Sequence, residues 1–179
     1  HPLTTTRLDD VTDLGPMDLL KIDVQGSELT IFQNGRDTLA GAVAVHTEMS
    51  FAPLYKGQPL FGEVDAELRA QGFVLHTFAT LKKWPIAPAV LDGQIFENHQ
   101  QVIEADVAYV KDFGRLEELT NEQVRHLALL AHFVYGSPDL AVRCLAHLTA
   151  TGAADERVLP AYAESLGRSV AVNGVRSDR

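Results

Sequence analysis

The sequence is poor in cysteine, in cationic residues and in long apolar runs, and each shortage excludes a class of protein. The only cysteine, Cys144, has no partner within the chain, so a disulfide-stapled scaffold is excluded. Lys and Arg number 15 against 24 Asp and Glu, a net charge of −9, and nucleic acids and anionic membranes would repel such a chain. The charge-free stretch from His126 to Pro138 is too short to cross a bilayer, so no transmembrane helix is predicted.

The remaining composition is that of a globular protein. The chain has 179 residues, of which 46% are hydrophobic, and this length fits one domain with a small appendage. We expect a cytoplasmic protein that binds neither nucleic acid nor membrane. The sequence starts at His1-Pro2 without an initiator Met, a basic segment or an apolar leader, and we therefore expect a piece of a longer protein.

Residues 18–49 have the pattern of a βαβ unit. Residues 18–24 form an apolar run rich in branched side chains, which predicts a strand buried on both faces that ends in a turn at Gln25-Gly26. Helical spacing follows over residues 27–41, and a second buried run covers residues 42–49. A strand, a helix and a strand in this order predict a parallel pair with a right-handed crossover.

Three further elements are expected to extend the sheet. Residues 61–70 have helical spacing, residues 73–78 predict a third strand and residues 102–110 a fourth. The connection over residues 79–101 contains several prolines, and connections of this length are usually lids or disordered segments. Because no helix is apparent between the third and fourth strands, we expect the fourth to pair antiparallel at the edge of the sheet.

The pattern changes to helix after Gly114. Residues 120–123 form a capping box for a first helix, Ser137-Pro138 begins a second, and residues 155–166 predict a third that Pro160 breaks or starts. This gives a sheet domain over residues 1–113, a helical appendage over 114–168 and a frayed tail over 169–179. We interpret the appendage as a cover for the sheet domain, with a partner-docking surface as the alternative.

The end of the predicted parallel pair is the place for a ligand, because open parallel sheets bind ligands outside the carboxyl ends of their strands. This rule selects residues 23–28 and residues 48–55. If the strands lie in matching register, Asp23 and Glu48 come close together. Their repulsion would then require a raised pKa, a pairing with Lys21, or a bridging cation or cationic ligand.

An ordered set of motifs resembles one known family. Residues 18–28 read DLLKIDVQGSE, and this string resembles the signature of the FkbM family of S-adenosylmethionine-dependent methyltransferases. Residues 7–11 are similar to the leucine-aspartate turn before that signature, and residues 48–55 and 68–73 resemble later segments in the same order. The resemblance covers Thr5 to Lys111, and an ordered set is more specific than a single motif.

The resemblance implies a fold: the C-terminal half of a Rossmann-like class I methyltransferase sheet, mostly parallel with an antiparallel edge strand, followed by a small helical appendage. Such enzymes hold the cofactor on a glycine-rich turn after their first strand. None of the 13 glycines here lies two residues from another, so no Gly-x-Gly turn is present. The resemblance therefore implies that the first three strands lie upstream of His1, and that this fragment alone binds the cofactor weakly or not at all and is inactive.

The resemblance also implies roles for the residues of the signature. Asp23 would lie beside the methyl or amino group of the cofactor, where it would accept the proton of the acceptor hydroxyl or hold a metal that does so. Lys21 and Glu28 are further candidate catalytic residues. Asp23, Gln25 and Gly26 would contact the cofactor, S-adenosylmethionine; Gln25 stands where Glu is commoner. The alternatives are that Asp23 binds the N–H groups of the turn, that Lys21 pairs with Asp23, and that Glu28 is a first-turn charge stabilised by the helix dipole.

The second strand would supply the acceptor side. We expect Glu48, Phe51 and Tyr55 to contact the acceptor, although packing under the loop is an equally ordinary role for the two aromatic residues. His46 with Glu48 could ligate a metal, but no tight ligand spacing supports this, so no metal is predicted. A His46 buried and hydrogen-bonded in the sheet is the favoured interpretation.

The predicted function is S-adenosylmethionine-dependent O-methyl transfer to a hydroxyl of a small molecule or glycan, by an enzyme that can form a homo-oligomer. The alternative is a non-catalytic interaction or scaffold module, because exposed strand edges favour association. A third interpretation takes residues 18–23 as the Walker B strand of an ATPase. The missing Gly-x-x-x-x-Gly-Lys-Ser/Thr motif weakens it.

Overall fold

A computed structural model describes residues 4–88, 93 and 100–167. The chain divides into two compact units, His1–Asp112 and Phe113–Arg179, which we describe separately. The tail predicted over residues 169–179 lies outside the described residues. The elements in chain order are η1 (Leu8–Asp10), β1 (Leu19–Ile22), α1 (Glu28–Gln33), α2 (Arg36–Ala40), β2 (Ala44–Ser50), α3 (Phe61–Ala70), β3 (Phe73–Trp84), β4 (Gln101–Lys111), η2 (Leu116–Glu118), α4 (Asn121–Phe133), α5 (Pro138–Ala150) and α6 (Val158–Ser165).

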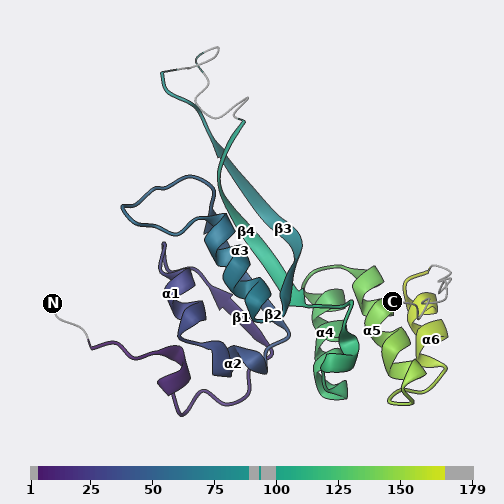
Figure 1. Ribbon diagram of the computed structural model, residues 1–179. Coiled ribbons are helices and arrows are strands. Elements are labelled where there is room, and N and C mark those ends of the chain that lie inside the picture. Colours follow the sequence, from purple (N-terminus) through teal and green to yellow (C-terminus); the bar gives the residue numbers. More distant parts are fainter. Residues whose placement is uncertain (1–3, 89–92, 94–99, 168–179) are drawn as a thin grey trace. The chain divides into compact units, whose positions relative to one another are not determined.

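The first unit is a four-stranded sheet with the order β1-β2-β4-β3 (Figure 1). Strand β1 pairs parallel with β2, which confirms the predicted βαβ unit. Strand β4 runs antiparallel to both of its neighbours, β2 and β3. Strands β1, β2 and β3 therefore all run in one direction and β4 runs against them.

The predicted position of the fourth strand at the sheet edge is wrong, because β4 lies between β2 and β3. Strand β3 continues past Phe78 to Trp84 and pairs with β4 up to that residue, so the two strands form a long antiparallel hairpin that extends from the sheet (Figure 1). The buried strand β2 needs a partner for its second edge, and β4 supplies a register of seven residue pairs there. Strand β3 is left outside, where most of its second half is exposed.

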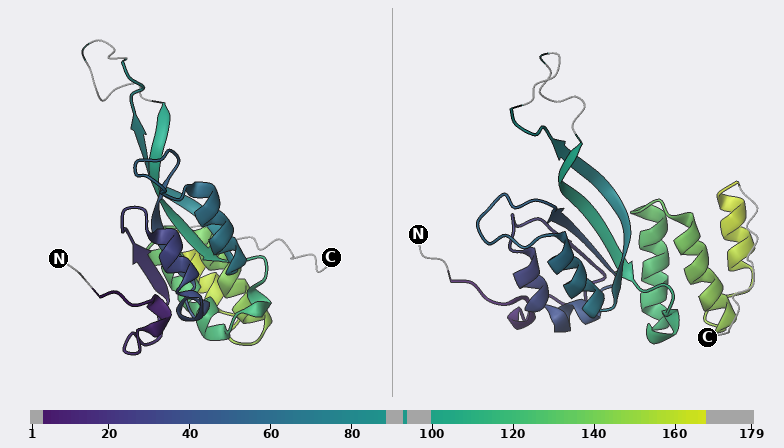
Figure 2. Two further views of the ribbon diagram at one scale, coloured as in Figure 1. Left: turned by 60° about the vertical axis from the view of Figure 1, so that its left-hand side comes forward. Right: turned by 45° about the horizontal axis from the view of Figure 1, so that its top comes forward.

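One face of this sheet carries the core of the first unit. Helices α1, α2 and α3 lie on this face (Figure 1, Figure 2). Alternation sends every second strand residue toward them, so that Ile22, Thr47 and Val107 lie side by side on neighbouring strands. The buried apolar residues of this core are Ile22, Phe32, Leu39, Ala42, Val45, Met49, Val64, Leu68, Phe73, Ala105, Val107 and Tyr109.

A buried hydroxyl joins this core to α3. Tyr109 of β4 is fully buried, and its hydroxyl donates a hydrogen bond to Oδ1 of Asp65 at 2.6 Å. Asp65 also accepts from Nε of Arg69 at 2.7 Å. Burial raises the pKa of Tyr109, and the adjacent carboxylate raises it further, so the phenol stays a donor.

The segment before β1 explains the leucine-aspartate turn that the sequence shows. The side chain of Leu8 packs so closely on Gly35 that a Cβ there would lie 2.6 Å from Leu8 Cδ2. The carboxylate of Asp9 accepts the backbone N–H groups of Asp37 and Thr38, at 3.3 and 2.8 Å, at the start of α2. These hydrogen bonds lower the pKa of Asp9. The turn therefore holds the helical crossover, which is split into α1 and α2 at Gly35.

In the second unit, helices α4, α5 and α6 lie side by side (Figure 2). The predicted capping box is confirmed, because Thr120 Oγ1 accepts from Gln123 N at 3.2 Å and Gln123 Oε1 accepts from Thr120 N at 2.9 Å. Pro160 lies in the first turn of α6, where its missing N–H costs nothing.

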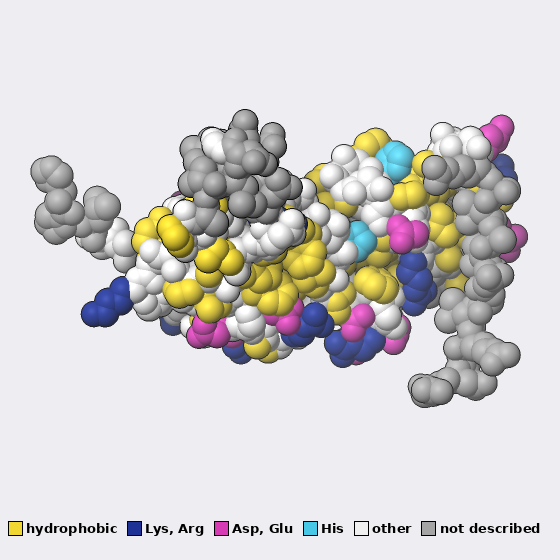
Figure 3. All heavy atoms as spheres, turned by 90° about the horizontal axis from the view of Figure 1, so that it is seen from above, with side chains coloured by type: hydrophobic (Ala, Val, Ile, Leu, Met, Phe, Trp, Pro, Cys, Tyr) yellow, Lys and Arg dark blue, Asp and Glu magenta, His cyan; other side chains and the backbone are white. Residues whose placement is uncertain are grey.

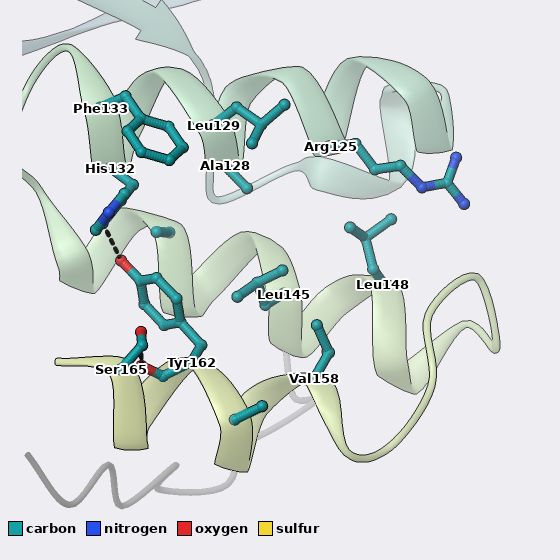
Figure 4. Close-up of a pocket in the computed structure, with 12 residues that line it drawn as sticks. Arg125, Ala128, Leu129, His132, Phe133, Leu145, Leu148, Val158, Tyr162 and Ser165 are labelled. Atoms are coloured by element: carbon teal, nitrogen blue, oxygen red, sulfur yellow. Dashed lines mark hydrogen bonds between the residues drawn. The ribbon is translucent and has the colours of Figure 1, made fainter. Parts of the chain in front are cut away.

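Helices α4, α5 and α6 line an apolar groove of about 570 Å³ within the second unit (Figure 4). His132 Nδ1 and the hydroxyl of Tyr162 lie 3.0 Å apart and join α4 to α6. Two exposed residues of α4, Leu129 and Phe133, also lie at the groove. In the described part of both units, no helix combines the length and apolar character that crossing a membrane requires.

The core predicts the effect of a truncation in α3. Leu68 is fully buried against the sheet, so Leu68→Ala should lower the free energy of unfolding of the first unit by about 2–5 kcal/mol. Hydrogen exchange of the β2 and β4 amides measures this loss. Leu81→Ala is the control, since Leu81 is 53% exposed and its truncation should cost less than about 0.5 kcal/mol. Equal losses in the two variants would contradict this core.

Candidate functional site

The turn after β1 is organised by a buried carboxylate. Gln25 has a φ of 55° and Gly26 a φ of 100°, so two successive residues are left-handed. Glu28, only 5% exposed, accepts the backbone N–H of Val24 at 3.0 Å and that of Gly26 at 2.9 Å. Ser27 precedes α1 but makes no side-chain capping bond. The carboxylate of Glu28 thus replaces the serine hydroxyl as the group that fixes this turn.

Because Glu28 binds the N–H groups of the turn, Asp23 does not hold the turn. The alternative in which Asp23 binds these N–H groups is therefore wrong. Its side chain is exposed, and Oδ1 accepts a hydrogen bond from Nε2 of Gln25 at 2.9 Å. The carboxylate therefore lies at the carboxyl end of β1 with its surface toward solvent. A ligand that approaches this end of the sheet can reach it.

Asp23 and Glu48 converge as the sequence predicts. The register pairs Lys21 with His46 and Ile22 with Thr47, and its continuation places Asp23 beside Glu48. The two carboxylates are bridged by one neutral amide, since Nε2 of Gln25 also lies 3.3 Å from Oε2 of Glu48. An amide that donates to both reduces their repulsion without adding a charge.

The alternative in which Lys21 pairs with Asp23 is wrong. Nζ of Lys21 lies 4.0 Å from Oδ1 of Asp106 on β4. The register explains this pairing. Lys21, His46 and Ala108 lie in one row across β1, β2 and β4, and Ala108 is small. The lysine side chain can therefore reach across the row to Asp106 on β4.

The cation that neutralises Glu48 comes instead from β3. The amine of Lys82 donates a hydrogen bond to Oε1 of Glu48 and lies 3.5 Å from Oε2 of Glu104. Glu48 is 7% exposed, so its charge needs such a partner. The hydrogen bond to Glu48 raises the pKa of Lys82 above its ordinary value, and the amine stays protonated through the physiological range.

His46 lies on the same polar face of the sheet. Its pKa is lowered, chiefly by burial and then by the charge of Lys21, against an opposite effect of Asp106. The imidazole is therefore neutral at pH 7. The described residues contain no group of three or more His, Cys, Asp or Glu placed to hold a metal ion.

The loop between β2 and α3 borders the carboxylates. The hydroxyl of Tyr55 donates to Oε1 of Gln25 at 3.4 Å, although the residue is 52% exposed. Phe51 is stacked on Phe61, with ring centroids 5.1 Å apart and planes 16° apart. Both rings also contact Phe78 of β3 in tilted geometry. Tyr55 therefore reaches the polar centre, while Phe51 belongs to an aromatic cluster beside it.

Hydrophobic side chains are also exposed around the projecting hairpin of the first unit, as the space-filling view shows (Figure 3). Residues of β3 with large exposed fractions are Phe78 (41%), Leu81 (53%) and Trp84 (49%). The carboxyl end of the sheet thus combines a polar centre with an apolar surface.

Residues 1–75 match the family described as the methyltransferase FkbM domain. Over these residues the chain is similar to the FkbM methyltransferase domain. The match confirms the family predicted from residues 18–28 and indicates a methyltransferase. It ends before Lys111, where the resemblance ended, and the assignment to the C-terminal half of the family's domain stays a prediction. No curated protein and no solved structure matches the chain.

The FkbM segment contains most of the site. All predicted site residues from Lys21 to Tyr55 lie inside it, whereas the β3 and β4 charges lie outside. Sequence reasoning missed Lys82, because the third strand was expected to end at Phe78. The alternation of Glu104 and Asp106 with apolar residues is the signal that could have shown a polar face on β4 and a need for cations beside it.

The ion pair between Lys82 and Glu48 gives a pH-dependent prediction. A raised lysine pKa means that the interaction stabilises the fold fully below pH 10.5, the ordinary value, and is lost as the pH rises through the raised value. In Glu48→Gln the main cause is removed, so the pKa of Lys82 should fall toward 10.5. Titration of the lysine side-chain NMR signals measures the change.

Glu104→Gln is the matched control for this titration. Glu104 lies farther from the amine, at 3.5 Å, and acts only through its charge, so this variant should lower the pKa of Lys82 less. An unchanged pKa in Glu48→Gln would show that Glu48 does not hold the lysine in solution.

Proposed function

We propose that this chain is part of an S-adenosylmethionine-dependent methyltransferase that transfers the methyl group to a hydroxyl oxygen of a small molecule or glycan. The FkbM match over residues 1–75 supports the enzyme class. The single observation that carries the site is the solvent-facing carboxylate of Asp23 at the carboxyl end of β1, released from the turn by Glu28.

The sheet supports a Rossmann-like arrangement. In doubly wound sheets the strands of the second half continue outward from the central strand, and the order β1-β2-β4-β3 has this form. Among the described residues, β1 pairs with β2 alone, so its other edge is open. We place the strands that would complete the cofactor site on that edge.

The residues present fit one end of the cofactor. An exposed carboxylate beside a left-handed glycine turn suits the cationic methionine end of S-adenosylmethionine, whereas no Gly-x-Gly turn is present for a close backbone contact. When bound, the cofactor supplies an electrophilic methyl group on its sulfonium. Asp23 would accept the proton of the acceptor hydroxyl, and Gln25 would hold Asp23 in place.

The acceptor side would be formed by the end of β2 and its loop. Glu48 lies next to Asp23, and its charge is fixed by Lys82. Tyr55 and Phe51 border the same end of the sheet from the following loop. Positioning of the acceptor oxygen in line with the methyl group is the main task of such a surface.

The open edge of β1 also favours the second candidate function, a non-catalytic interaction module, because unpaired strand edges associate with other chains. Cofactor binding separates the two candidates, since an interaction module requires none.

The first test of the proposal is calorimetric titration of S-adenosylhomocysteine. The longest translation product of the same reading frame should bind it, and the chain of 179 residues should bind it roughly tenfold or more weakly, because each missing hydrogen bond is worth about 1 kcal/mol. Tight binding by the short chain would contradict the need for further strands. Failure of the long product to bind would favour the interaction module.

The second test addresses the base. In the long product, Asp23→Asn should lower methyl transfer roughly 10²- to 10⁴-fold, the range for a lost general base, with a smaller effect on the affinity for S-adenosylhomocysteine. Ser27→Ala is the control, because this neighbouring hydroxyl makes no side-chain capping bond. Full turnover in the Asn variant would remove Asp23 from the role of base.

A further inference from the structure

The side chain of Gln58 makes three hydrogen bonds that no motif in the sequence indicates. Its Oε1 accepts the backbone N–H of Leu54 at 2.8 Å and that of Tyr55 at 3.2 Å. Its Nε2 donates to Oγ of Ser50, the last residue of β2, at 2.7 Å. One side chain thus ties the middle of the β2–α3 loop to the end of the strand from which the loop leaves.

The backbone of the loop also forms a turn that ends at Gln58. Gln58 N donates to Tyr55 O at 3.2 Å, which closes a turn of four residues, and Gly57 within it has a φ of 75°. A turn with a left-handed third residue favours glycine at that position. Tyr55 therefore begins a closed turn, and both its N–H and its carbonyl are bonded to Gln58.

Gln58 also touches the other loop of the site. An added Cβ at Gly26 would lie 3.2 Å from Cγ and 3.5 Å from Nε2 of Gln58, so the turn after β1 packs directly on this side chain. The narrow cleft at this contact is lined by Gly26, Glu28, Glu48, Met49, Ser50, Gln58, Pro59 and Val64. Gln58 therefore lies where the turn after β1 meets the end of β2.

We propose that Gln58 is a positioning residue of this site: its amide sets the β2–α3 loop so that the Tyr55 hydroxyl stays on Gln25, the residue that bridges Asp23 and Glu48. The proposal rests on the proposed function for its relevance to methyl transfer. Its geometric content does not depend on cofactor or acceptor. Without the amide, the N–H groups of Leu54 and Tyr55 lose their acceptor, and the loop loses its connection to Ser50.

Hydrogen exchange of single backbone amides in the full chain tests the geometry. Gln58→Leu keeps the size of the side chain and removes its polar atoms, so the amides of Leu54 and Tyr55 should exchange roughly five- to tenfold faster. The amides of β2 should keep their protection. Unchanged exchange at Leu54 and Tyr55 would overturn the proposal.

Two further variants separate positioning from a general loss of stability. Gln58→Glu keeps oxygen acceptors for both N–H groups and should restore most of the protection. Gln71→Leu makes the same substitution at an amide that binds Phe32 O and Glu67, and it should leave the exchange at Leu54 and Tyr55 unchanged. If Gln58→Leu fails to fold, the Gln58→Glu variant provides the test. Fast exchange of the Leu54 and Tyr55 amides in this variant, with the β2 amides still protected, would overturn the proposal.

A double-mutant cycle then tests the link to the site, with S-adenosylhomocysteine as the probe and the long product as the protein. Gln58→Leu and Tyr55→Phe should each weaken binding roughly two- to fivefold, and the double variant no more than either alone. Additive losses would overturn the action through Tyr55. Absence of binding in the unaltered protein would instead defeat the proposed function, while the exchange data would still decide the geometry of Gln58.

Discussion

The parallel register of β1 on β2 is the constraint on which the rest of the site depends. Lys21 of β1 and Glu48 of β2 lie on the face opposite the core, and the pairing of Ile22 with Thr47 brings the next residue of each strand, Asp23 and Glu48, side by side. A shift by one residue would turn one of these carboxylates into the apolar core. The core therefore selects the register, and the register assembles the acidic centre.

Two acids so placed stay close because each has its own partner. Glu48 is held by the amine of Lys82, and the amide of Gln25 donates to both carboxylates. The backbone N–H groups of the turn donate their hydrogen bonds to the carboxylate of Glu28. This division leaves Asp23 with one neutral partner and an open side, which is the condition under which a carboxylate can still take up a proton from a ligand.

The sequence allowed the features that depend on local patterns to be predicted. It did not allow prediction of those that depend on which strands and side chains pair. Periodicity and capping chemistry predicted the βαβ unit, the helices and the convergence of Asp23 with Glu48. The position of β4 was wrong, because nothing local states which edge a returning strand will join. The alternative pairing of Lys21 with Asp23 was wrong for a related reason. A long side chain can reach acidic residues on several strands, and the sequence does not show that β4 places Asp106 within reach. Gln58 stayed unnoticed since it belongs to no motif.

The hairpin of β3 and β4 carries a consequence for spectroscopy. Trp84, the last residue of β3, is the only tryptophan in the chain and is half exposed. Its indole emission therefore comes from a single known position at the projecting end of the sheet, free of overlap from other indoles. The protein contains a natural optical reporter for changes at that end, and no label has to be introduced.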